Sequence, residues 1–226
     1  MTTPLDDLME IASQALADMD YARCESLCVE ALGQASEQND WVIYQRVLLP
    51  LQEARRQRRQ AALDGPVLLG TINPQSKIES QIKGRDQGCV VLTWPSTPSD
   101  LLSLSGWVRE NKRPIELLFA DNTPETATWK ITSTSGPVLS IDLPAPKQDW
   151  IGRWVDPSSL TPPTPAHWFM QASEALGDAA LAAIEPAPDS LDYLRALEAA
   201  LSCVDDHEIL HQRLASAAKA IHKVTQ

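Results

Sequence analysis

The chain has 226 residues, of which 43% are hydrophobic and 22% are charged, and its formal net charge is −11. This composition is typical of globular proteins with a hydrophobic core, and the acidic charge argues against a general nucleic-acid role because it repels phosphate backbones. No apolar run approaches the roughly 18 residues of a membrane span, and the N-terminus lacks a signal-peptide pattern, so we expect a cytoplasmic protein with no membrane partner.

The first 64 residues are predicted to form an N-terminal helical segment. Apolar residues recur at helical spacing over residues 4–17, 20–37 and 40–63. Pro50 lies inside the third stretch and is expected to kink or restart that helix, because proline removes a backbone donor. The sequence Asp64-Gly65-Pro66 ends the helical region.

Small or apolar side chains mark the predicted hairpin between the first two helices. They form a stripe on residues 19–32, at Ala22, Cys24, Leu27, Cys28, Ala31 and Leu32. Over residues 5–38, this pattern resembles the tetratricopeptide repeat, and it returns more weakly at 40–62 and 166–222. The resemblance implies helical hairpins and a role in peptide or protein binding.

Residues 65–143 are predicted to form a small α/β domain with a mostly parallel sheet plus a β-hairpin. Buried strands are expected at 67–71, 89–94 and 115–120, because these are short β-branched runs between Gly and Pro. A helix is expected from Thr97, an N-cap followed by Pro98, and a short one at 76–84. Residues 128–132 and 138–142 are predicted to pair as the hairpin.

The rest of the chain is predicted to be a proline-rich connector followed by helices. Residues 144–165 contain six prolines, so 144–164 is expected to be extended and without regular elements, with its Trp and Ile side chains lying against one of the domains. Helices follow at 165–176, 178–185, 190–203 and 206–223 in a C-terminal segment, 165–226. The expected fold class is mixed α+β, with helical ends flanking the α/β domain.

The basic cluster Arg55, Arg56, Arg58 and Arg59 is the candidate partner-binding surface. At helical spacing the four side chains share one broad face, and guanidinium groups suit acidic peptides or phosphate. The alternative is that these arginines pair with acids of neighbouring helices. The sequence leaves both open.

A second candidate site lies at the ends of the predicted strands. Thr93, Asp121 and Asn122 follow two of them, and open α/β sheets bind ligands at the carboxyl ends of their strands. The same residues are also ordinary in turns.

The sequence His207-Glu208-Ile209-Leu210-His211 matches the zinc pattern H-E-x-x-H. A third ligand is missing, because no Asp or Glu follows residue 208, and Asp205 with Glu208 is expected to cap the last helix instead. Cys24 and Cys28 are expected to pack in the hairpin seam. We therefore assign no metal, no cofactor and no catalytic residue.

These observations favour a non-enzymatic protein-interaction or scaffold module with a protein partner, which could also form homo-oligomers. The alternative is a small-molecule-binding or enzymatic α/β domain with its site at the strand ends.

Overall fold

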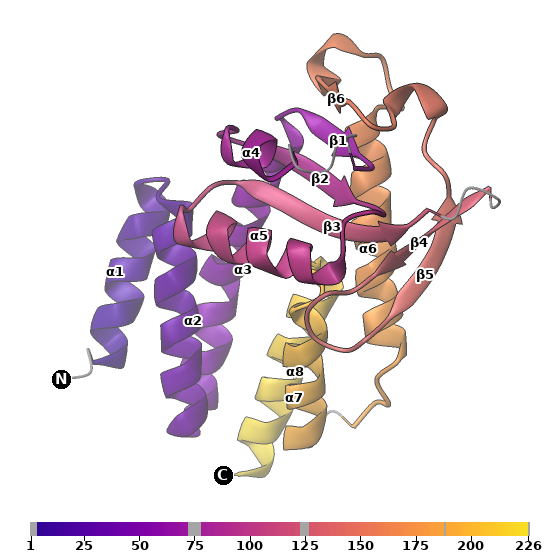
Figure 1. The fold of residues 1–226 in the computed structure, drawn as a ribbon. Coiled ribbons are helices and arrows are strands. Elements are labelled where there is room, and N and C mark those ends of the chain that lie inside the picture. The colour runs from indigo at the N-terminus through magenta and orange to yellow at the C-terminus, as the bar shows by residue number, and fades with distance from the viewer. Residues whose placement is uncertain (1–3, 72–77, 123–126, 188, 226) are drawn as a thin grey trace. The chain divides into compact units, whose positions relative to one another are not determined.

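The computed structural model describes residues 4–71, 78–122, 127–187 and 189–225 (Figure 1). In these ranges the protein is a mixed α+β fold with eight α-helices and one open six-stranded sheet. The chain divides into two compact units. We call Met1–Arg58 with Leu181–Gln226 the helical unit, and Arg59–Ala180 the sheet unit.

The helical unit is built from both ends of the chain. Its helices are α1 (Leu5–Ala17), α2 (Tyr21–Glu37), α3 (Trp41–Leu63, to Arg58 in this unit), α7 (Leu191–Leu201) and α8 (Glu208–Val224). These ranges confirm the N-terminal helices and two of the C-terminal ones predicted from periodicity. α3 continues as one helix through Pro50, so the expected restart does not occur.

The helices α1 and α2 form the predicted hairpin, and several of their buried side chains are small. Ala12, Cys24, Cys28 and Ala31 are fully buried. Asp20 begins α2 by accepting a hydrogen bond from the Arg23 N–H at 3.1 Å. The buried residues of α1 also include Leu5 and Leu8, so the core of this hairpin combines small and large apolar side chains.

Side-chain hydrogen bonds join the N-terminal helices to the C-terminal ones within the helical unit. The Tyr44 hydroxyl of α3 donates to the Glu198 carboxylate of α7 at 2.5 Å. The Arg55 guanidinium of α3 donates to the backbone carbonyl of Asp205 at 3.0 Å. The two ends of the chain are therefore in direct contact within this unit.

The sheet unit contains strands in the order β5-β4-β3-β2-β1-β6. Their bounds are β1 Val67–Leu69, β2 Gly88–Leu92, β3 Ile115–Asp121, β4 Thr128–Thr132, β5 Ser140–Pro144 and β6 Trp154–Val155. β1, β2 and β3 are parallel, whereas β4, β5 and β6 each pair antiparallel to a neighbour. The expected β4–β5 hairpin is confirmed, but the sheet is mixed and not mostly parallel.

Helices cover both faces of the sheet (Figure 1). On one face, α4 (Ile78–Lys83) and α5 (Pro98–Glu110) bury Ile82 and Leu101 against Leu68 and Val90. α5 begins with the predicted cap: the Thr97 hydroxyl accepts from the Asp100 N–H, and the Asp100 carboxylate accepts from the Thr97 N–H.

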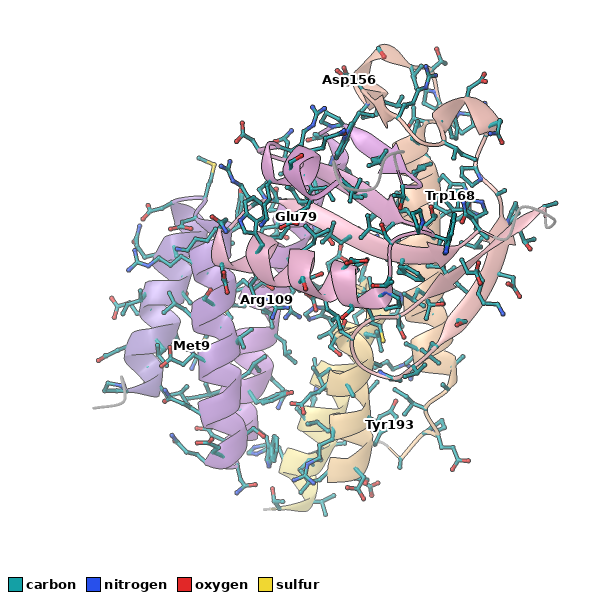
Figure 2. All side chains as sticks on the ribbon, viewed as in Figure 1. Met9, Glu79, Arg109, Asp156, Trp168 and Tyr193 are labelled. Atoms are coloured by element: carbon teal, nitrogen blue, oxygen red, sulfur yellow. The ribbon has the colours of Figure 1, made fainter. Side chains whose placement is uncertain are left out.

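α6 (Pro165–Ala182) covers the opposite face. Its Trp168 side chain is labelled in Figure 2. The Trp168 ring meets Trp129 of β4 edge-on at 5.4 Å between centroids, and the Trp168 indole donates to the Pro144 carbonyl. The expected break at Gly177 is wrong. A glycine inside a helix costs only about 1 kcal/mol, and the buried Phe169 and Leu176 side chains of α6 offset that cost.

The proline-rich connector contains regular elements, contrary to the prediction. Two 3₁₀ turns, Gln148–Trp150 and Pro157–Ser159, flank β6. β6 pairs with β1, and the Trp154 indole donates to the Gln81 side chain at 2.9 Å. The connector side chains therefore lie against the sheet unit as expected, but they do so by completing its edge.

Among the described residues, none of the helices combines the length and apolar character needed to cross a bilayer.

Candidate functional site

A groove of about 390 Å³ lies within the helical unit, between helices from both ends of the chain. Helices α2, α3 and α7 contribute residues at helical spacing, so that one stripe of each faces the groove, and α8 adds one residue. The lining residues are Val29, Leu32, Gly33 and Ser36 of α2; Tyr44, Leu51 and Arg55 of α3; Glu198, Leu201, Ser202 and Asp205 of α7 and the turn after it; and Leu214 of α8.

The floor of the groove is apolar and its edges are exposed. Leu51 and Leu214 are each 1% exposed, whereas Val29 is 49% exposed. Such a volume lies near the lower limit of the roughly 300–1,000 Å³ range of ligand sites. The groove therefore has room for side chains of a bound molecule.

Gly33 opens the wall that α2 contributes. A Cβ atom added there would meet no other atom within 4 Å, so close packing inside the protein does not require glycine. Glycine in a helix interior costs about 0.5–1 kcal/mol relative to alanine. An added Cβ atom at Gly106 of α5 would also meet no atom within 4 Å. The two glycines differ in that Gly33 lines the groove.

The buried Tyr44 ring places a hydroxyl against Glu198 at one side of the groove. Burial and the Glu198 carboxylate both raise the pKa of Tyr44, so this hydroxyl stays protonated and donates to Oε1 of Glu198. The hydrogen bond holds the carboxylate in a fixed position.

Glu25 of α2 binds two of the predicted arginines behind the groove. Its carboxylate accepts from Arg55 at 3.0 Å and also from Arg58. Burial alone would raise the pKa of Glu25, but the two guanidinium groups outweigh it and lower the pKa below its ordinary value. Arg55 and Arg58 have side-chain exposures of only 13% and 21%.

The other two predicted arginines lie elsewhere. Arg56 is 63% exposed and pairs with Glu53 one turn earlier in α3. Arg59 belongs to the sheet unit, where its 6% exposed side chain contacts Glu174 of α6 at 3.5 Å. The structure therefore brings Arg55 and Arg58 together on one carboxylate and separates them from Arg56 and Arg59, as the pairing alternative predicts.

The predicted strand-end residues lie at the same edge of the sheet. Thr93 follows β2 and is buried, and its hydroxyl accepts from the Thr71 N–H at 3.0 Å. The Thr71 hydroxyl donates to the Thr93 carbonyl and contacts Ser96 at 3.1 Å. Asp121 ends β3 in an exposed position, with Asn122 next to it. The polar groups of Thr93 are thus used to tie β1 to β2.

The H-E-x-x-H residues are used in the start of α8. The helix begins at Glu208, and Nδ1 of His207 accepts from the Leu210 N–H. The expected cap at Asp205 is therefore wrong: the turn before α8 directs the Asp205 carbonyl to Arg55 and to Nε2 of His211 instead. No group of three or more His, Cys, Asp or Glu side chains suited to a metal ion occurs in the described ranges.

Cys24 and Cys28 of α2 are fully buried with their sulfur atoms 3.9 Å apart, and the Cys24 thiol contacts the Pro50 carbonyl of α3 at 3.8 Å. The hydrogen bond that its thiol shares with Cys24 and burial raise the pKa of Cys28. Its thiol is therefore protonated and packs as a small apolar group.

Sequence reasoning missed the groove. Two signals were available: the spacing of Val29, Leu32, Gly33 and Ser36, and a glycine in the middle of a helix. Neither could reveal that α7 supplies the facing wall, because that wall lies more than 150 residues further along the chain.

Comparisons with protein-family models, with curated proteins and with solved structures found no match to the chain.

Proposed function

We propose that the protein is a cytoplasmic, non-enzymatic interaction module that binds a polypeptide partner in the groove of its helical unit. The observation that carries the proposal is the groove itself, which combines an apolar floor, an open glycine position and a fixed carboxylate. The tetratricopeptide-like pattern of α1 and α2 agrees with this role.

The groove is better suited to binding than to catalysis. Its polar side chains are Ser36, Tyr44, Arg55, Glu198, Ser202 and Asp205. Arg55 is held by Glu25, and Tyr44 is held by Glu198. A nucleophile next to a base, which covalent catalysis requires, is not among these contacts.

Site-specific photo-crosslinking tests the proposal. Benzoylphenylalanine replaces Val29, which is 49% exposed at the groove, in the full chain expressed in its native cells. We expect irradiation to give an adduct of one defined protein mass. An excess of the same protein without the photoreactive residue should remove the adduct, because it competes for the limited number of specific sites on the partner.

The control places the same photoreactive residue at Leu102 of α5, which is 52% exposed. This position matches Val29 in exposure but lies in the sheet unit. Equal adducts from both positions, or none from Val29, would contradict the proposal.

A further inference from the structure

Negative charge is concentrated in the helical unit. Its residues include 17 Asp and Glu but nine Lys and Arg, an excess of eight negative charges, whereas the sheet unit has an excess of three. Three charged side chains line the groove, Arg55, Glu198 and Asp205. Arg55 is paired with Glu25, and the Glu198 carboxylate accepts a hydrogen bond from the neutral Tyr44 hydroxyl, which leaves its negative charge in place.

The α2 wall adds to this charge. Glu30 and Glu37 are exposed and follow directly after the groove residues Val29 and Ser36. On α7, Arg195 is the base one turn before Glu198. Glu198 is therefore the acidic side chain that both lines the groove and is held in place by a hydrogen bond.

The walls of the groove favour a helix over an extended peptide. They consist of α2, α3, α7 and α8, whose backbone groups are hydrogen-bonded within the helices. An extended peptide that binds by adding a strand needs free backbone partners at a sheet edge, and these helices offer none, whereas a helix inserts side chains at positions i, i+3, i+4 and i+7 into a groove between helices.

We infer that the partner segment is a cationic amphipathic helix, with apolar side chains over Val29 and Leu32, the exposed and half-buried apolar residues of the groove, and a Lys or Arg side chain on Glu198. This inference rests on the proposed function of the groove. The Tyr44 hydroxyl occupies Oε1 of Glu198, and a cation binds the carboxylate beside it. Gly33 leaves space for the partner helix on the opposite wall.

Phage display of helical peptides tests the inference. The library contains peptides of about 15–18 residues, long enough to form a helix, with randomised positions on one face. Selection uses the full chain, with removal of phage that also bind Gly33→Leu, in which the added side chain fills the groove. We expect enrichment of Leu-type residues at i, i+3 and i+4, next to one or more Lys or Arg.

The selected peptide is then measured by fluorescence anisotropy. Glu198→Gln keeps an oxygen that accepts from Tyr44 but removes the charge, and we expect it to weaken binding about tenfold, the loss typical of a charge-assisted hydrogen bond. Glu10→Gln removes the same charge from α1, outside the groove, and is expected to leave the affinity unchanged. Replacing the peptide lysine with norleucine should remove the effect of Glu198→Gln.

The possible results distinguish a failure of the cationic-helix inference from a failure of the groove as a binding site. Groove peptides without Lys or Arg, or unchanged affinity in Glu198→Gln, would overturn the cationic helix but keep the groove as a binding site. If no peptide loses binding in Gly33→Leu, both proposals are wrong. Urea unfolding checks that the Gly33→Leu variant is folded. Gly106→Leu is the matched control for replacing a helical glycine outside the groove, and Ser36→Leu is a second variant whose side chain fills the groove.

Discussion

At the scale of single residues, neighbouring arginines of α3 have opposite surroundings. Arg55 is 13% exposed on Glu25, whereas Arg56 is 63% exposed on Glu53. We expect Arg55→Glu to lower the free energy of unfolding by about 3–5 kcal/mol, because it places two carboxylates together in a poorly solvated site. Arg56→Glu should change it by no more than about 1 kcal/mol.

Urea unfolding of the full chain measures both variants. The substitutions are chemically identical and adjacent, so the difference between them reports the environment alone. Equal losses of stability would show that Arg55 is not held as the structure describes.

His211 provides a second prediction at this scale. Burial lowers its pKa from 6.5 to about 4, with the charges of Arg55 and His207 acting in the same direction and the Asp205 carbonyl and Glu25 opposing them. Below pH 6.5 the unfolded chain binds a proton at this residue that the folded chain excludes. The contribution of neutral His211 to the free energy of unfolding is therefore fully present above pH 6.5. It is lost as the pH falls toward 4, by about 1.4 kcal/mol per pH unit.

The variant His211→Gln isolates this contribution, because a side-chain amide can still donate to the Asp205 carbonyl. Between pH 6.5 and 4, we expect the wild type to lose about 3 kcal/mol more stability than the variant, as measured by urea unfolding at each pH. Parallel pH profiles for the two proteins would show that His211 is not buried in its neutral form.

At the scale of elements, the same glycine substitution should have opposite effects in different places. Gly33 and Gly106 lie inside helices with open space at the Cβ position, so alanine should stabilise each by about 0.5–1 kcal/mol. Gly70 after β1 has a φ of 86°, and its Cβ would lie 3.2 Å from Ile151. Alanine at position 70 should therefore lower the free energy of unfolding by more than the roughly 0.5–1 kcal/mol gained at Gly33 and Gly106.

Thermal and urea unfolding of the three alanine variants check this prediction. Gly70→Ala is the informative contrast, because it tests the turn that brings the connector against β1. Stabilisation by all three substitutions would contradict the described backbone at Gly70.

At the scale of the whole molecule, the helical unit depends on helices from both ends of the chain. Leu214 of α8 is 1% exposed and lines the groove with Leu51 of α3. We expect Leu214→Ala to cost about 2–5 kcal/mol through the cavity it leaves. Because the unit contains both ends, amide hydrogen exchange should also speed up in α2 and α3.

The exposed Ile209 of α8 provides the control, because Ile209→Ala removes an apolar side chain that is 44% exposed in the same helix. Faster exchange confined to α7 and α8 in Leu214→Ala would show that the two ends fold as separate parts.

Local sequence determined the types of most elements, because periodicity and caps act over a few residues. The helices from Leu5 to Leu63 begin and end within about two residues of prediction. The sequence from Thr97 to Asp100 contains both members of the capping box. Short-range hydrogen bonds and one buried face are enough to specify such elements.

Tertiary structure decided the features that depend on distant partners. β6 exists because β1 offers an edge to the proline-rich connector, and α6 continues through Gly177 because the helix buries its apolar side chains on both sides of that residue. The groove requires α2 and α3 to face α7 and α8. No local pattern encodes these outcomes, since their free energy comes from burial and pairing between segments far apart in the chain.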